Sequence, residues 1–220
     1  MKRRARDVVV VGASAGGFHP LQTLFTDLPA DFGAAVAVVL HRSPSFVPEL
    51  TQVVGHSKLT PIEPEDGRAF EPGFVFIAPR DQHMTVADGN VQLDRGPKQH
   101  HARPAIDPLF RSAAESYGDR VIGVLLSGAL SDGVSGLLAI KARGGMCVIQ
   151  DPHEASFPSM PINALRYDHV DLMCPIAVMA RALVALVDGE SPADLANELS
   201  GVLLPSSLTG TRLRNRGRWS

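Results

Sequence analysis

The stretch VVVVGASAGG, residues 8–17, decides the fold of this chain. Residues 8–11 form a β-branched run without alternation, which is typical of a strand buried on both faces of a parallel sheet. Five small residues, 12–16, follow this run and carry a single hydroxyl group, that of Ser14. They leave two hypotheses: Ser14 is a nucleophile on a tight turn, or the glycines form a cradle for a phosphate.

Two β-α-β units are predicted from the pattern of apolar residues. After the first strand, apolar residues at helical spacing predict a helix over 20–28, and a second buried strand covers 34–40. The same order returns later, with a buried strand over 121–126, a helix over 136–142 and a strand over 146–150. Such units join parallel strands through a right-handed crossover, so the chain is expected to form a parallel sheet flanked by helices.

The middle of the chain differs from these units. Short strands are predicted over 74–78, 83–87 and 91–94, and the turn-forming sequence Asp-Gly-Asn separates the last two. We interpret this section as an antiparallel β-hairpin appended to the parallel sheet. The fold class is therefore α/β: a doubly wound, mainly parallel sheet in a Rossmann-like three-layer arrangement, with an antiparallel β-hairpin insert.

Two further helices complete the pattern. One is predicted over 107–117, with Asp107 as its N-cap and the proline that follows at the first helical position. The other covers 175–187. Beyond it the apolar pattern is lost, so we expect one domain over residues 1–190 and a C-terminal extension over 191–220, a short helix followed by a mobile basic tail.

Composition narrows the classes of function. The chain has 220 residues, 45% of them hydrophobic, and a formal net charge of -2 at pH 7. It lacks the basic excess typical of proteins that bind nucleic acid or an anionic membrane. Cys147 and Cys174 lie in apolar stretches, which predicts buried free thiols in a reducing compartment. The apolar run after the basic N-terminus is too short for a signal peptide or a membrane span, so a cytoplasmic location without membrane insertion is expected.

Residues 12–16 fit the pattern G-x-S-x-G, in which a sharp strand-to-helix turn exposes a serine oxygen above the sheet. Gly12, Gly16 and Gly17 are expected to form this elbow because a Cβ atom there would clash. The dinucleotide-binding pattern instead requires glycine where Ser14 stands, and an acidic residue where the second strand ends in Leu-His-Arg. These differences favour the nucleophile without excluding the phosphate cradle.

A serine nucleophile needs a base, and the base needs an orienting carboxylate. Ser14 leaves the first strand, His41 leaves the second, and Asp132 follows the strand over 121–126. Functional residues of open α/β sheets gather at the carboxyl ends of the strands, so these three are expected along one edge. His83 is the main competitor for the role of base. No metal-ligand spacing is evident, and neither a metal nor a cofactor is predicted.

With these residues assembled, the chain resembles the catalytic domain of the CheB-type protein-glutamate methylesterases, which act on chemotaxis receptors. The resemblance extends from residue 8 to about residue 187. It rests on segments that occur in the same order: GASAGG at 12–17, LHRSPSFVPEL at 40–50, IAPRDQHM at 77–84, RPAIDPLF at 103–110, LSGALSDGVSGL at 126–137 and MPINAL at 160–165.

The resemblance implies a serine hydrolase that removes methyl groups from glutamate γ-methyl esters of receptor-type signalling proteins. Methanol is released, and some glutamines are deamidated. Its catalytic triad falls on Ser14, His41 and Asp132. The backbone N–H groups of Ala15 and Ala129 are expected to stabilise the oxyanion.

Two positions depart from the family pattern. Ala15 stands where the family usually has threonine, and Ala129-Leu130 stand where it tends to have methionine-glycine. The family also usually carries an N-terminal receiver domain, whereas this sequence starts at the catalytic domain. Control by a receiver is therefore expected to be absent or supplied by another chain. His83 and Arg103 are expected to be structural or substrate-side residues.

Three hypotheses stay open from the residues. The chain is a serine methylesterase, a dinucleotide-binding oxidoreductase, or a catalytically inactive module that binds receptors. The departures at Ala15 and Leu130 are the sequence features that suit the inactive module.

Overall fold

The computed structural model describes residues 6–41, 52, 54–167 and 169–205. Most of the predicted motif at 40–50 and the basic tail beyond residue 205 lie outside this range. The described chain forms a seven-stranded sheet of order β3-β4-β2-β1-β7-β8-β9 and a separate two-stranded sheet, β5-β6. Every neighbouring pair in the large sheet is parallel, and the small sheet is antiparallel. The predicted fold class is therefore confirmed.

The strands are β1 (Val8–Ala13), β2 (Ala35–Leu40), β3 (Thr60–Ile62), β4 (Phe74–Ile77), β5 (His83–Ala87), β6 (Asn90–Asp94), β7 (Val121–Leu125), β8 (Met146–Gln150) and β9 (Leu172–Cys174). The helices are α1 (Phe18–Asp27), α3 (Ile106–Tyr117), the 3-10 turn η1 (Gly118–Arg120), α4 (Val134–Ala142), α5 (Ser159–Leu165), α6 (Ile176–Asp188) and α7 (Pro192–Glu198). No helix within these described ranges combines the length and hydrophobicity that a bilayer crossing requires.

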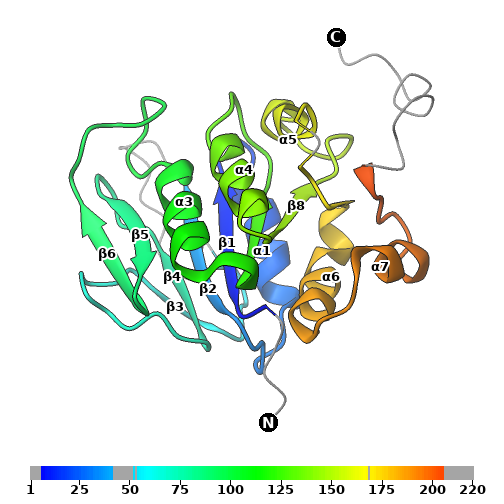
Figure 1. Cartoon of the computed structure of the whole chain (residues 1–220), viewed down its shortest axis with the longest axis horizontal. Helices are drawn as coiled ribbons and strands as arrows, with labels where there is room; N and C mark the ends of the chain where they lie inside the picture. The colour runs from blue at the N-terminus through cyan, green and yellow to red at the C-terminus, as the bar shows by residue number, and fades with distance from the viewer. Residues whose placement is uncertain (1–5, 42–51, 53, 168, 206–220) are drawn as a thin grey trace.

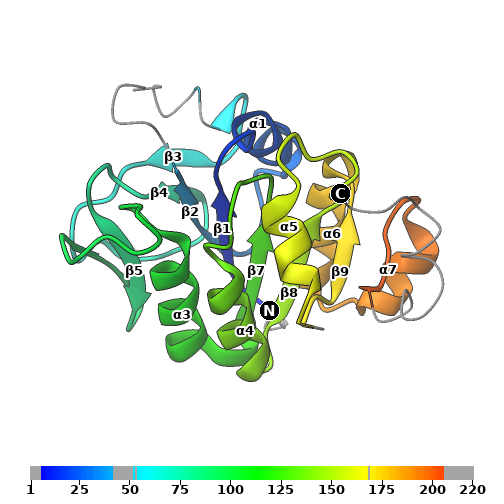
Figure 2. The same cartoon turned by 90° about the horizontal axis from the view of Figure 1, so that it is seen from above.

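Helices cover both faces of the large sheet, which explains the unbroken apolar run of β1. Val9 and Val11 pack into the core beneath α1 and α6, whereas Val8 and Val10 pack into the core beneath α3 and α4. Figures 1 and 2 show these two helix layers on opposite sides of the sheet. Because successive side chains of a strand point to opposite faces, a doubly covered strand has no polar position.

The sequence-based assignment of the middle strands was partly wrong. The strand predicted over 74–78 is β4, and it belongs to the large sheet, where it pairs with β2 and β3. Only β5 and β6 form the hairpin. Strand β3 was not predicted, since it has three residues and contains Pro61. Proline is tolerated there because β3 is an edge strand, where one side of the backbone needs no partner.

The N-terminus of α3 also differs from its prediction. The N-cap is Ala105 and not Asp107, and Pro108 is the third helical residue, where its missing N–H group costs no helical hydrogen bond. The Asp107 side chain is completely buried and accepts hydrogen bonds from the N-terminal turn of another helix, α4. A long-range contact therefore replaces the local cap.

Both cysteines are free and buried, as predicted. Burial raises the pKa of the Cys147 thiol far above its ordinary value, and that of Cys174 to about 12. A thiol with so high a pKa is a poor nucleophile near neutral pH, so neither cysteine competes with Ser14 for that role.

Helices α3 and α4 pack closely at Gly136. An added Cβ atom there would lie 2.4 Å from Phe110 Cβ and 3.2 Å from Asp107 Oδ1. Both distances are shorter than a carbon atom tolerates without movement of its neighbours. The absence of a side chain at Gly136 is what lets the two helices approach.

Gly136→Ala is expected to lower the free energy of unfolding by about 1–3 kcal/mol, because the added methyl group overpacks the contact with Phe110. The sign of this change in the free energy of unfolding is informative, because a glycine-to-alanine substitution at an exposed position inside a helix stabilises a protein by about 1 kcal/mol. Denaturant unfolding measures the effect, with Ser135→Ala on the exposed side of α4 as the control. An unchanged or increased stability of Gly136→Ala would contradict the close packing.

Candidate active site

The register of the large sheet brings Ser14 and His41 together. Ala13 pairs with Leu40 across β1 and β2, so the next residue of each strand leaves the sheet at the same edge. The backbone N–H of His41 donates to Ala13 O (2.9 Å), and that of Ser14 donates to Ser127 O (3.0 Å) after β7. Three neighbouring strands therefore end at one rim, as predicted from the sequence.

The side chains of the predicted triad form a continuous chain of hydrogen bonds. His41 Nδ1 lies 3.2 Å from Ser14 Oγ, and His41 Nε2 lies 2.8 Å from Asp132 Oδ2. Asp132 is buried, whereas the His41 side chain is 20% exposed. The imidazole thus links a buried acid to a hydroxyl that substrate can reach.

The surroundings of Asp132 keep its carboxylate ionised. Burial alone would raise its pKa, but the hydrogen bonds from His41 and from the backbone N–H groups of Ile106 and Asp107 outweigh this and lower the pKa below its ordinary value. An ionised Asp132 accepts a hydrogen bond from Nε2–H of His41, which leaves the Nδ1 lone pair facing Ser14. This tautomer is the one that a general base requires.

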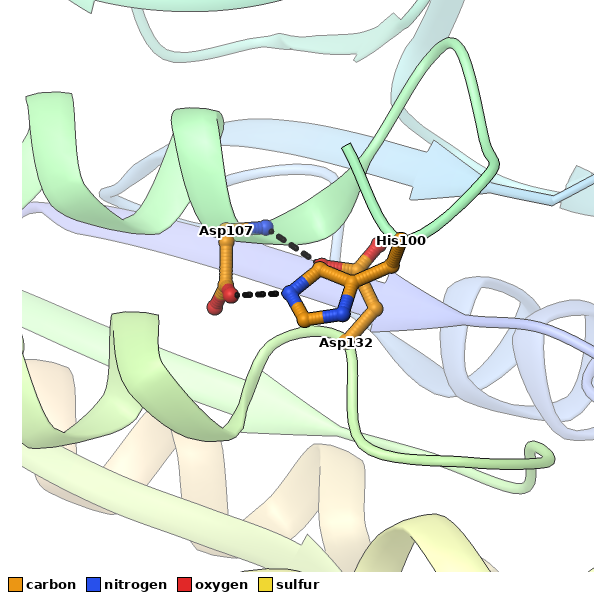
Figure 3. A group of neighbouring side chains, drawn as sticks. All are labelled: His100, Asp107 and Asp132. Atoms are coloured by element: carbon orange, nitrogen blue, oxygen red, sulfur yellow. Dashed lines mark hydrogen bonds and ion pairs between the residues drawn. The ribbon is translucent and has the colours of Figure 1, made fainter. Parts of the chain in front are cut away.

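Asp132 and Asp107 each accept hydrogen bonds from the backbone at the start of a helix that lies next to the other aspartate. Asp132 accepts the N–H groups of Ile106 (2.7 Å) and Asp107 (3.0 Å) in the first turn of α3. Asp107 Oδ1 accepts the N–H groups of Gly133 (3.1 Å) and Gly136 (2.6 Å) at the start of α4. Each aspartate therefore caps the helix that carries or follows the other, and Figure 3 shows the two side by side.

His100, Asp107 and Asp132 place potential metal-ligand atoms within 4.8 Å of one another, and they are the only such group found in the described part of the chain. Their oxygens already have donors. His100 Nε2 contacts Asp107 Oδ2 at 2.9 Å, Arg111 contacts the same oxygen at 3.2 Å, and backbone N–H groups fill the remaining positions. This cluster is therefore better suited to holding helix ends than to binding a cation.

The glycines of the elbow lie where the backbone has close neighbours. Gly16 has φ +70°, and an added Cβ would lie 2.8 Å from Ser127 Oγ. A Cβ on Gly12 would lie 2.5 Å from Ile106 Cγ2, and one on Gly17 would lie 2.7 Å from Ala13 Cβ. These positions fit the crowded turn that G-x-S-x-G predicts, and their role in catalysis stays a prediction.

Ala15 and Ala129, the predicted oxyanion donors, lie on two loops beside Ser14. Within the described residues no hydrogen bond is found for their N–H groups, whereas those of Ser14 and Gly128 each donate one. Ser127 holds the two loops together, because its Oγ donates to Ala15 O (2.9 Å) and accepts from the N–H of Phe157 (3.0 Å). Two free donors on clamped loops are what an oxyanion site needs.

His83 and Arg103 support the loop that enters α3. His83 is buried, accepts a hydrogen bond from the N–H of Ala105 (3.2 Å) and donates to Pro97 O (3.1 Å). Arg103 donates to Asp81 (2.7 Å) and to two backbone oxygens, those of Arg95 and Gly96. The hydrogen bonds of both residues run to this loop and not to Ser14 or His41, which favours a structural role.

The structure adds two features to the sequence-based description of the site, the role of Asp107 and the conformation of Leu130, whose departure from the family pattern the sequence had shown. Asp107 supports Asp132, but the Asp-Pro pair suggested an ordinary helix cap. Leu130, two residues before Asp132, has φ +67° and a side chain that is 68% exposed. The replacement of a glycine by leucine in the family pattern was the available signal for Leu130.

Asp132 should make the stability of the protein depend on pH. Because its pKa in the folded state lies below the ordinary value of about 3.9, the ionised carboxylate stabilises the fold above about pH 4. This contribution is lost as the pH falls through the lowered pKa. The difference in free energy of unfolding between wild type and Asp132→Asn should therefore be largest at about pH 6 and become smaller below about pH 4.

Guanidinium unfolding at a series of pH values measures this difference. Glu115→Gln, which changes an exposed carboxylate of α3, is the matched control and should give a small, nearly constant difference. A difference for Asp132→Asn that stays constant across the acid range would contradict the stabilised carboxylate.

Comparisons with known proteins identify the family. A family model described as CheB methylesterase matches residues 9–183. A protein-glutamate methylesterase/protein-glutamine glutaminase of Methanosarcina mazei is 36% identical over 195 residues, which are 84% of this chain and 53% of that protein. One of Anaeromyxobacter dehalogenans is 38% identical over 183 residues, 82% of this chain and 54% of that protein.

A solved structure is also similar. The catalytic domain of the Thermotoga maritima CheB methylesterase superimposes with a TM-score of 0.78 and 34% sequence identity, covering 83% of this chain and 99% of that domain. The chain spans about half the length of the two curated relatives named above. The match of the family model to residues 9–183, the identity to these relatives and the shared fold show that this chain belongs to the CheB methylesterase family.

Proposed function

We propose that the protein hydrolyses glutamate γ-methyl esters in a signalling protein and releases methanol. The observation that carries the proposal is the hydrogen-bond chain from Ser14 through His41 to the buried Asp132, at 3.2 and 2.8 Å. The names of the relatives, protein-glutamate methylesterase/protein-glutamine glutaminase, support the choice of substrate.

In the first half of the reaction, Ser14 Oγ attacks the ester carbonyl while His41 Nδ1 takes its proton. Asp132 stabilises the resulting imidazolium and holds its orientation. The N–H groups of Ala15 and Ala129 donate to the oxyanion of the tetrahedral intermediate, and one such donor is typically worth about 3 kcal/mol. When the intermediate collapses, Nδ1 returns the proton to the departing methoxide, and methanol leaves.

In the second half, a water molecule repeats the sequence. Its proton passes to His41 Nδ1, its oxygen attacks the acyl carbon, and Ser14 recovers the proton as leaving group. The product is a glutamate side chain. Deamidation of glutamine follows the same steps with ammonia as the first leaving group.

The substrate follows from this reaction. It is a methylated receptor or another methylated signalling protein. We also propose a cytoplasmic location, which the two free, buried thiols support.

Ser14→Ala and His41→Ala are expected to abolish methanol release from a methylated receptor preparation, because they remove the nucleophile and the base. Asp132→Asn should lower turnover by about 10⁴, the typical effect of losing the orienting acid. Ser116→Ala changes an exposed serine of α3 and serves as the control with normal turnover. Full turnover of Ser14→Ala, at unchanged circular dichroism, would rule out the nucleophile.

Covalent labelling separates the hydrolase from the other hypotheses. A fluorophosphonate probe should modify Ser14 in the wild type and leave Ser14→Ala unlabelled, and mass spectrometry locates the adduct. A dinucleotide-binding protein would instead gain thermal stability from NAD or NADP, and an inactive module would respond to neither. If NAD or NADP raises the thermal stability of the protein and the fluorophosphonate does not label Ser14, the proposed function is wrong and a dinucleotide-binding function takes its place.

A further inference from the structure

Leu130 has an unusual backbone conformation for its residue type. Five residues other than glycine have positive φ in the described chain: Asp81, Asp88, His100, His101 and Leu130. Aspartate and histidine are among the types that tolerate this region, whereas a leucine there is strained by contact between its Cβ and the backbone. Leu130 is the one apolar member of this described set.

The conformation is held from both sides. Asn163 Nδ2 donates to Leu130 O (2.7 Å). Gly128, two residues earlier, donates its N–H to Phe157 O (2.9 Å) and accepts from the N–H of Met160 (3.0 Å). Glycine would adopt the same backbone without strain, so folding alone does not favour leucine at this position.

The side chain of Leu130 is also exposed to solvent and is not part of the hydrophobic core. Leu130 is 68% exposed, and it lies between Ala129, a proposed oxyanion donor, and the loop residues that lead to Asp132. The large hydrophobic side chains that are exposed in the described chain are Leu130, Leu138, Phe157 and Tyr167. A Cβ on Gly16 of the elbow would lie 2.9 Å from Phe157, while Leu138 and Tyr167 line a cavity of about 370 Å³ with Asn163 and Ser131.

Leu130 is strained and exposed, and it lies two residues before Asp132 in the loop that also carries Ala129. An exposed leucine there buries its side chain only when another molecule covers it. The reaction acts on a side chain of a polypeptide, so the residues beside the ester must lie across this rim. We propose that Leu130 is a specificity-determining residue that contacts an apolar side chain of the substrate protein next to the esterified glutamate. This inference rests on the proposed function.

Paired peptides test the contact. One peptide carries a glutamate γ-methyl ester flanked by leucines, and the other carries serines in their place. The wild type should hydrolyse the leucine peptide with a kcat/KM roughly five- to tenfold higher, through KM, as expected for partial burial of a leucine. Leu130→Asn should lose this preference while raising Tm, because asparagine tolerates positive φ. Leu130→Met keeps an apolar side chain and should retain the preference.

Asp88→Asn is the matched control, since Asp88 also has positive φ (51°) but lies in the β5-β6 turn. It should leave the preference unchanged. A preference that persists in Leu130→Asn, or is absent in the wild type, would overturn the inference.

A binding measurement keeps this result separate from the chemistry. Fluorescence anisotropy with Ser14→Ala, alone and combined with Leu130→Asn, reports binding of the two peptides without hydrolysis. Preferential binding that depends on Leu130, with no methanol released by the wild type, would overturn the proposed function and support the contact. Equal binding of both peptides would overturn the contact even if both are hydrolysed.

Discussion

The mutual capping of α3 and α4 by Asp132 and Asp107 is the interaction on which the site depends. The first turn of a helix presents unsatisfied N–H groups and the positive end of its dipole, and a buried carboxylate satisfies both. Asp132 does this for α3, and Asp107 does it for α4. A shift of either helix would break hydrogen bonds to a buried aspartate side chain. The position of the acid is therefore set by helix packing, not by the loop that carries it.

This arrangement determines the ionisation of Asp132 and, through it, which nitrogen of His41 carries the proton. Burial alone would raise the pKa of Asp132, but the hydrogen bond from His41 and the two N–H donors at the start of α3 lower it and keep the carboxylate ionised. An ionised acid fixes the proton of His41 on Nε2 and leaves Nδ1 toward Ser14. The ring thus faces the serine with the opposite nitrogen to that of the chymotrypsin-type triad. The same proton transfer is available, because either ring nitrogen can act as the base.

The rim combines a rigid sheet, which fixes the positions of Ser14 and His41, with a loop from β7 to α4 that contains a strained residue. Ser14 and His41 leave neighbouring strands in register, so the sheet fixes their separation. The loop from β7 to α4 carries the residues proposed to face a substrate, and hydrogen bonds from both sides hold it in shape. Loops on a rigid sheet vary without disturbing the core. Leu130 is an example, because its strained backbone lies in the loop and not in the sheet.

The sequence by itself determined the parallel sheet, the elbow and the edge where Ser14 and His41 meet. Unbroken β-branched runs mark doubly covered strands, and parallel strands end at a common edge, so local pattern was sufficient. Only the tertiary structure decided the pairing of β4 with β2, the role of Asp107 and the backbone of Leu130. The backbone N–H groups of α4 that Asp107 accepts lie 26 and 29 residues away, and Leu130 O is held by Asn163, 33 residues later. Such contacts form only when distant segments pack, and no local periodicity encodes them.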